Sequence, residues 1–364
     1  MTRKKKKSPK DIKHVISSFW ARSFWNKLFI VIVGVIFVSI SSMYGIAQWY
    51  IDKHADEPVV LGASFIPSYA RSFGLDEKET LRALLEDLGI RRIRLVSYWD
   101  IIEKDEGTFD FSELDWQYDM IEDYGGEVTL SIGLRQPRWP ECHMPTWARY
   151  LAPSDWEPKL NNFLTETVNR YKDRRATISY QLENEFLLSA FGECDDHDIE
   201  RLKREFALVK SLDSEKPLIV SRSNNATPSW PINEPLGDLN AASIYKRVWD
   251  GTVTKRYFEY PLPSWYYAFL AAGAEITTGR NTFIHELQAE AWAPISLQDA
   301  SIEEQDKSLP ADELYGRIEY AVDTGIKTLD IWGVEWWYWR KVNGDPNLWN
   351  EGKRAIEDLS GQTN

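Results

Sequence analysis

Strand-like and helix-like segments alternate along residues 58–360, and this alternation constrains the fold more than any other feature of the chain. Six segments have the composition of helices, at 76–88, 111–124, 156–171, 198–212, 264–273 and 312–324. Eight short apolar runs have the composition of strands, at 59–65, 92–97, 128–133, 178–185, 217–221, 241–245, 281–286 and 327–332. Strands that alternate with helices pair in parallel. Eight such units in about 300 residues predict an α/β fold, a (β/α)8 TIM barrel over residues 58–360.

The segment before the barrel differs sharply in charge. Residues 1–27 hold nine basic residues and one acidic residue, whereas residues 28–50 hold no charge. As a helix, this uncharged run of 23 residues would span roughly 34 Å, which is enough to cross a bilayer. A basic flank stays in the cytoplasm, and Trp49 and Tyr50 suit an interfacial aromatic belt.

We therefore predict a single-pass membrane protein whose barrel lies outside the cytoplasm. Its parts are a basic cytoplasmic segment (1–27), a transmembrane signal anchor (28–50), a short linker (51–57) and the barrel. The alternative is a cleaved signal peptide, because the densest apolar part, residues 28–40, is short enough for one. No A-x-A cleavage pattern follows it, which favours the anchor.

The remaining chain is acidic and rich in aromatic residues. Of 43 basic and 56 acidic residues, 34 and 55 lie after residue 27, which gives that part a net charge of −21. Such a surface repels a phosphate backbone, so nucleic acid is an improbable partner. Seventeen Trp, 17 Tyr and 15 Phe suit a carbohydrate ligand, because aromatic faces stack on sugar rings. The alternative is that most of them pack between barrel and helices.

Two glutamates stand where predicted strands end. Asn184 and Glu185 close the fourth strand, and Glu286 closes the seventh. The carboxyl ends of barrel strands face one mouth, so the two acids should converge there. Retaining hydrolysis of a glycoside uses two such carboxyl groups, one as acid and base and one as nucleophile. Glu290 competes with Glu286 for the second position, whereas Glu183 is set aside in favour of Glu185.

These strand ends resemble those of the clan A glycoside hydrolases, the barrel superfamily of cellulases, β-mannanases, β-galactosidases and β-xylosidases. The resemblance extends over nearly all of residues 58–355, and its most specific elements are the Asn-Glu pair and the second Glu. It implies that Glu185 is the acid/base and Glu286 the nucleophile. It also implies supporting positions on strands two, six and eight, which here are Arg94, Tyr245 and Trp332.

Further residues are expected to bind the substrate. Asn184 would hold the sugar 2-hydroxyl, and Trp332 would lie beneath the sugar. Arg94 and Tyr245 would donate hydrogen bonds to Glu286, although Arg94 could instead form a surface salt bridge and Tyr245 could belong to the core. The Pro-rich loop 134–147 should form a wall of the cleft. The remaining candidates are Trp139 and His143 from this loop and Trp336 after strand eight.

Cysteine and histidine usage bounds the rest of the chemistry. Cys142 and Cys194 follow strands three and four, so a disulfide between adjacent loops is expected outside the cytoplasm. No His-x-His follows strand one, which disfavours a metal-dependent hydrolase. An acidic stretch holds Glu193, Asp195, Asp196, His197 and Asp198, and a solvated loop explains it better than a cation site does.

The sequence thus predicts a membrane-anchored retaining β-glycosidase that acts on oligo- or polysaccharides without a cofactor or metal. Two alternatives stay open at this point. A transglycosylase would use the same catalytic pair, and an inactive barrel would only bind carbohydrate.

Overall fold

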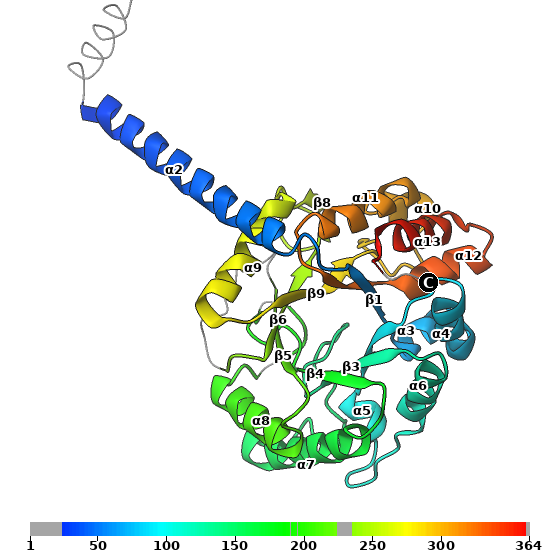
Figure 1. The fold of residues 1–364 in the computed structure, drawn as a ribbon. Coiled ribbons are helices and arrows are strands. Elements are labelled where there is room, and N and C mark those ends of the chain that lie inside the picture. The colour runs from blue at the N-terminus through cyan, green and yellow to red at the C-terminus, as the bar shows by residue number, and fades with distance from the viewer. Residues whose placement is uncertain (1–23, 190, 195, 224–234, 362–364) are drawn as a thin grey trace, which may run out of the picture.

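Eight parallel strands close into a barrel in the computed structural model, which describes residues 24–189, 191–194, 196–223 and 235–361 (Figure 1). Around the barrel, β1 to β6 follow one another, and β9 and β10 return to β1. The strands are β1 (Val60–Ser64), β2 (Arg92–Val96), β3 (Glu127–Ile132), β4 (Thr177–Leu182), β5 (Leu218–Ser223), β6 (Leu239–Ile244), β9 (Thr282–Gln288) and β10 (Thr328–Trp332). The predicted (β/α)8 barrel is confirmed.

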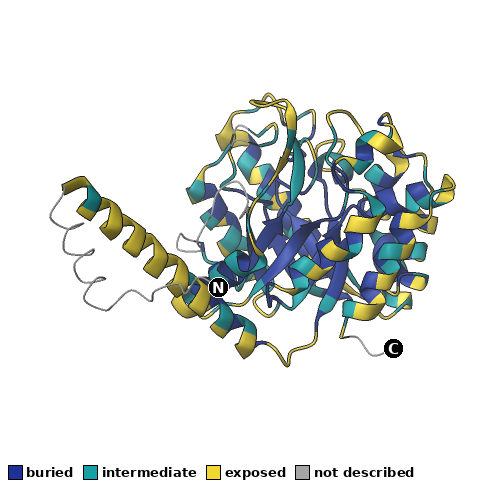
Figure 2. Cartoon of the chain, turned by 90° about the horizontal axis from the view of Figure 1, so that it is seen from above, coloured by how far each residue is buried: buried dark blue, intermediate teal, exposed yellow. Residues whose placement is uncertain are grey.

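Helices surround the barrel, as Figures 1 and 2 show. The six predicted ones are α4 (Glu77–Glu86), α6 (Ser112–Asp123), α7 (Pro153–Tyr171), α8 (Ile199–Leu212), α9 (Ser264–Thr278) and α11 (Ala311–Val322). The sequence did not predict α3 (Pro67–Ser72), α5 (Trp99–Ile102), α10 (Ile302–Asp306), α12 (Val334–Val342), α13 (Asn347–Leu359) or the antiparallel hairpin of β7 (Arg247–Asp250) and β8 (Arg256–Glu259). This hairpin lies between β6 and α9.

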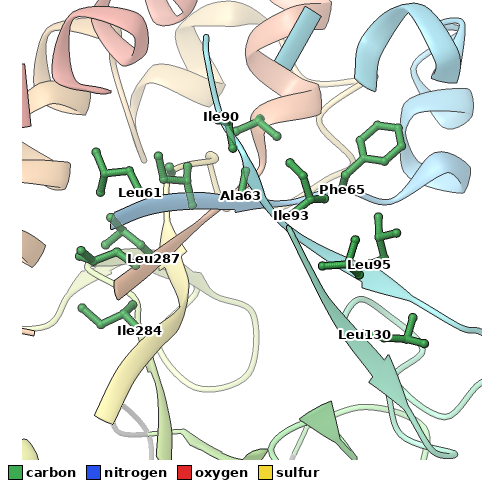
Figure 3. Close-up of a cluster of buried hydrophobic side chains, with 14 of the residues drawn as sticks. Leu61, Ala63, Phe65, Ile90, Ile93, Leu95, Leu130, Ile284 and Leu287 are labelled. Carbon is green, nitrogen blue, oxygen red and sulfur yellow. The ribbon is translucent and has the colours of Figure 1, made fainter. Parts of the chain in front are cut away.

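Strand residues alternate between an apolar outer layer and a polar barrel interior. Leu61, Ala63, Ile93 and Leu95 belong to the buried layer drawn in Figure 3, which packs between strands and helices. The side chains between them form the polar interior, where Arg92 Nε donates a hydrogen bond to Asp330 Oδ1 at 3.0 Å. Both apolar and polar sets are buried, because helices cover the whole barrel.

One interior position must be glycine. A Cβ at Gly62 would lie 2.4 Å from Asp330 Oδ1 and 2.8 Å from the Arg92 carbonyl oxygen. The ion pair of Arg92 and Asp330 therefore occupies the space that a side chain in β1 would need.

The first helix, α2 (Phe24–Lys53), is long and apolar enough to cross a membrane, and no other helix of the described residues passes that test. Its residues up to 46 are exposed or half-buried, but Ala47 and Tyr50 are buried against the barrel. The structure corrects the expected linker at 51–57, because α2 continues to Lys53 and His54 is buried. The physical reason is that this helix end packs on α9, so it is not a free tether.

Candidate active site

Glu185 lies in a sharp turn directly after β4. The backbone φ angles of Glu183 and Glu185 are 53° and 44°, a region that non-glycine residues rarely adopt. The turn is held by the backbone N–H of Glu185, which donates to Ser221 Oγ at 2.8 Å. Ser243 Oγ donates to Glu185 Oε1. Burial, followed by the negative charge of Glu286, raises the pKa of Glu185 to about 8.

Glu286 reaches the same site through a bulge in β9. Ala242 pairs with Ile284 but Ser243 pairs with Glu286, so His285 is an extra residue in the ladder. A bulge re-aims side chains, and here consecutive His285 and Glu286 both contact Arg94 inside the barrel. A regular strand would have sent one of them outward.

Two donors hold the Glu286 carboxyl group. Arg94 Nη2 donates to Oε1 and Tyr245 Oη donates to Oε2, both at 2.9 Å. Burial and the charge of Glu286 raise the pKa of Tyr245 well above its usual value, so its hydroxyl keeps the proton it donates. The structure therefore brings Arg94, Tyr245 and Glu286 together as the sequence predicted.

A chain of hydrogen bonds runs from Arg94, which donates to Glu286, through His285 and Ser243 to Glu185. Arg94 Nη1 lies 2.5 Å from His285 Nδ1, and because arginine can only donate, this nitrogen accepts. The proton of the neutral imidazole then lies on Nε2, which is 3.0 Å from Ser243 Oγ and donates to it. Burial, followed by the charge of Arg94, lowers the pKa of His285 well below its usual value and keeps the ring neutral. Ser243 is left with its hydroxyl proton directed at Glu185.

Asn184 is oriented by neighbours on both sides of its amide. Its Oδ1 accepts from Gln181 Nε2 at 3.0 Å, and its Nδ2 donates to Glu141 Oε2 at 3.1 Å. One N–H of the amide is left for a ligand. Glu141 is buried, which raises its pKa to about 7, although Arg135 at 3.6 Å opposes that rise.

The two alternative acids are paired elsewhere. Glu290 receives Arg138 Nη1 and Nη2 on its two oxygens at 3.1 and 3.2 Å. Glu183 accepts from the backbone N–H groups of Leu134 and Arg135 at 2.8 and 2.7 Å and pairs with Arg201 at 3.0 Å. Both arrangements use the carboxylate to fix structure around the site.

The predicted aromatic residues lie in different surroundings. Trp332 is nearly buried at the end of β10, with the guanidinium of Arg138 4.5 Å from its ring centroid. Trp139 is 57% exposed, and its ring meets the edge of Phe191 at 5.9 Å. Phe191 contacts Trp292 with ring centroids 5.8 Å apart, and Trp292 contacts Tyr245 with centroids 5.4 Å apart. A row of aromatic rings therefore runs from the site toward the surface.

Two predicted ligand-binding residues lie inside the protein. His143 is buried and stacks on Tyr98 with ring centroids 3.6 Å apart, and burial lowers its pKa to about 4. The prediction that Trp336 binds the substrate is wrong. This residue of α12 is fully buried, and its indole N–H donates to Gln305 at 2.8 Å. A ring without an exposed face has no surface for a sugar, so Trp336 does not join the site.

The predicted disulfide is present and fixes one wall of the site. Cys142 and Cys194 are bonded, with Cα atoms 5.3 Å apart, and join the loops after β3 and β4. In the acidic stretch, Asp196 pairs with Arg201, and Asp198 caps α8 by accepting from the N–H of Glu200 at 3.0 Å. Asp195 lies outside the described residues.

Sequence reasoning missed Ser243, His285, Glu141 and the aromatic pair of Phe191 and Trp292. His285 directly precedes Glu286, and strict alternation along a strand would point it away from the site. Ser243 could have been found, since it lies two residues before Tyr245 on the same face of the sixth strand. Glu141 lies in an irregular loop, where no periodicity signals orientation.

Comparison with known proteins identifies the fold. No family model matches the chain. The β-galactosidase Bga of Halorubrum lacusprofundi is 25% identical over 144 residues, which cover 35% of this chain and 20% of that protein. The sequence match thus spans a fifth of this relative's length.

Solved structures match over a larger share. A GH5_18 protein from Streptomyces cattleya in complex with GlcNAc has a TM-score of 0.59 at 14% identity, covering 84% of this chain and 82% of that one. A GH5_18 protein from Bifidobacterium longum subsp. infantis gives 0.58 at 11% identity, with 84% and 80% covered. The β-galactosidase of Halorubrum lacusprofundi gives 0.54 at 13% identity, with 82% and 58% covered. The chain therefore has the same barrel fold as these proteins.

Proposed function

We propose that this protein is a retaining glycoside hydrolase that cleaves β-glycosidic bonds of oligo- or polysaccharides. The observation that carries the proposal is the opposed environment of two carboxyl groups at one barrel mouth. Burial and the negative charge of Glu286 raise the pKa of Glu185 to about 8, which favours the protonated acid at neutral pH. Glu286 receives a guanidinium and a phenol hydroxyl, which stabilise a carboxylate. Such a difference supports Glu185 as the acid and Glu286 as the nucleophile.

In the first step, Glu286 attacks the anomeric carbon while Glu185 transfers its proton to the departing glycosidic oxygen. The bond from the anomeric carbon to that oxygen breaks, and a covalent glycosyl ester forms on Glu286. The ester carries no negative charge, so one cause of the raised pKa of Glu185 disappears. Glu185 then takes a proton from water, whose oxygen attacks the anomeric carbon and releases Glu286.

The surrounding residues would bind the sugar. The remaining amide N–H of Asn184 would donate to the 2-hydroxyl, a contact that strengthens in the transition state. Trp332 would border the cleaved sugar, and the aromatic run ending at exposed Trp139 would stack on further units. GH5_18 structures carry GlcNAc and Manβ1-4GlcNAc, which makes β-linked disaccharides of this kind suitable first substrates.

The mechanism is tested by separate replacement of the two acids. Glu286→Ala should abolish turnover of an aryl β-glycoside, because no ester can form, and azide should restore activity with an α-azide product. Glu185→Ala should keep the first step for a good leaving group, slow the second, and give the β-azide product.

Glu290→Gln is the matched control, because this neighbouring acid is paired with Arg138 and should not act as nucleophile. If Glu286→Ala retained full activity while Glu290→Gln lost it, the assignment would be overturned. A carboxyl separation in the range of about 6.5 to 9.5 Å in a crystal structure would instead indicate inversion.

We further propose that α2 anchors the protein as a single-pass helix with the barrel outside the cytoplasm. The basic residues before it and the disulfide after it support this orientation. Protease added to intact cells should digest the barrel but spare the residues before α2. A soluble product that begins near residue 48 would show signal cleavage instead.

A further inference from the structure

The membrane-anchor candidate α2 is clamped along one barrel helix. Near the start of α9, Tyr44 meets Trp265 edge to face with centroids 5.9 Å apart. Near the end of α9, Glu275 pairs with Lys53 and accepts from His54 Nε2 at 2.9 Å. The two helices therefore run side by side in the same direction, with contacts at both ends of α9.

The direction of α9 shows which way α2 points. A helix that follows a barrel strand returns from the mouth to the base. Trp265 is thus on the mouth side, and Glu275 is near the base. Ile51 lies beside Gly325, just before β10 begins, which also places the end of α2 at the base. The part of α2 before Tyr44 consequently continues beyond the mouth-side end of α9, and Figures 1 and 2 show it slanting away from the side of the barrel.

The length of this projecting part leaves no room for a stalk. Phe24 to Met43 is a stretch of 20 residues, which as a helix spans roughly 30 Å, about the thickness of the hydrocarbon core. Its one charged residue, Lys27, lies at the far end, where its side chain can reach the headgroups. If this stretch crosses the bilayer, the edge of the barrel mouth beside α9 lies closest to the membrane surface.

The β7–β8 hairpin supplies an independent observation on the mouth side. It emerges after β6 and leads into α9. Val253 near its tip is 84% exposed and Phe258 is 45% exposed. Lys255 and Arg256 stand between them, on a chain that is otherwise strongly acidic. Exposed apolar residues beside basic ones suit contact with anionic lipid headgroups.

We propose that α2 holds the barrel with its mouth toward the bilayer, and that the substrate is a β-linked glycan carried by a membrane lipid. The proposal rests on the proposed function, since it names the substrate class of the same site. The sugar of a glycolipid enters the mouth from the membrane surface, whereas a free polysaccharide has to approach through the gap between barrel and headgroups.

Orientation can be tested without activity. The full chain is reconstituted in phosphatidylcholine and phosphatidylglycerol vesicles with a fluorophore on Val253→Cys at the hairpin or on Asp173→Cys, an exposed base position between α7 and β4. A quencher attached to lipid headgroups should quench the label at 253 and leave the label at 173 bright. Equal quenching, or stronger quenching at 173, would overturn the proposed orientation.

Substrate class is tested by releasing the clamp. The variant carries Glu275→Lys, which repels Lys53, and a flexible Gly-Ser insert of about 20 residues after Glu57, with a mean length of roughly 25 Å. Glu166→Lys on exposed α7 is the matched charge reversal. The released variant should cleave a soluble aryl β-glycoside at the wild-type rate. It should cleave a vesicle-embedded β-glycolipid of the same sugar at least roughly tenfold more slowly, because the barrel mouth is no longer held at the membrane surface.

Each outcome separates the two proposals. Wild-type protein that cleaves soluble polysaccharide faster than the embedded glycolipid overturns the substrate class and leaves the hydrolase proposal intact, as does a released variant with undiminished glycolipid cleavage. Wild-type protein inactive on every aryl glycoside overturns the hydrolase proposal, while the labels still decide orientation. If the released variant loses activity on both substrates, quenching of the labels at 253 and 173 decides the orientation.

Discussion

Ser243 should set the alkaline limit of activity through its hydrogen bond to Glu185. The hydroxyl donates to the carboxyl group and so favours its ionised form. Replacing Ser243 with Ala removes that donor from a buried site. A hydrogen bond to a charged group contributes about 1.5 to 3 kcal/mol, and a pKa difference of one corresponds to about 1.36 kcal/mol. We therefore expect Ser243→Ala to raise the pKa of Glu185 by about 1 to 2.

The assay is the pH dependence of kcat/KM on an aryl β-glycoside with a poor leaving group, which requires the protonated acid. In the wild type, activity should fall as pH rises through about 8. In Ser243→Ala, the falling limb should move to higher pH by about 1 or more. Ser221→Ala is the matched control, because Ser221 accepts from the backbone N–H of Glu185 and leaves the carboxyl group untouched.

An alkaline limb that stays in place in Ser243→Ala, or that moves to lower pH, would refute this reasoning. So would an equal displacement in Ser221→Ala, since the effect would then come from a shift of the turn. A general loss of activity without a change of profile would show that Ser243 positions the substrate and does not tune the acid.

Two further predictions concern stability. Because Glu185 has a raised pKa in the folded protein, its ionisation opposes folding; stability should fall as pH rises from 4.5 to about 8, and Glu185→Gln should flatten that fall in Tm. Replacing Cys142 and Cys194 with Ala should lower the free energy of unfolding by about 2 to 5 kcal/mol, measured by denaturant titration of the oxidised wild type and the variant. Equal stability of the two proteins would mean that the loops are held without the bond.

The sequence predicted those features that depend on local pattern. The barrel strands were recognisable because their outward residues form apolar runs, and Glu185 and Glu286 because they end such runs. The helix α12 was not predicted, because its Trp, Tyr and Val residues favour strands. Gly333, with φ of 100°, ends β10 and starts this helix.

The features that escaped prediction depend on register or on distant partners. The bulge that turns His285 and Glu286 to one side is a property of pairing with β6, which no single strand encodes. Glu141 contacts Asn184 from a different loop, next to the disulfide-bonded Cys142. Trp336 has the composition of a ligand platform, and only its packing against Gln305 excludes that role.

The polar interior explains why closure of the barrel and assembly of the site are a single event. Arg94 in β2 donates to Ser64 in β1, Gln181 in β4 and both His285 and Glu286 in β9. One layer below, Arg92 joins Asp330 in β10 to Thr129 in β3. Each guanidinium is buried or nearly so, and an unpaired buried charge is costly. In an open barrel both arginines would lose partners on other strands. The interactions that fix Glu286 therefore also favour the closed sheet.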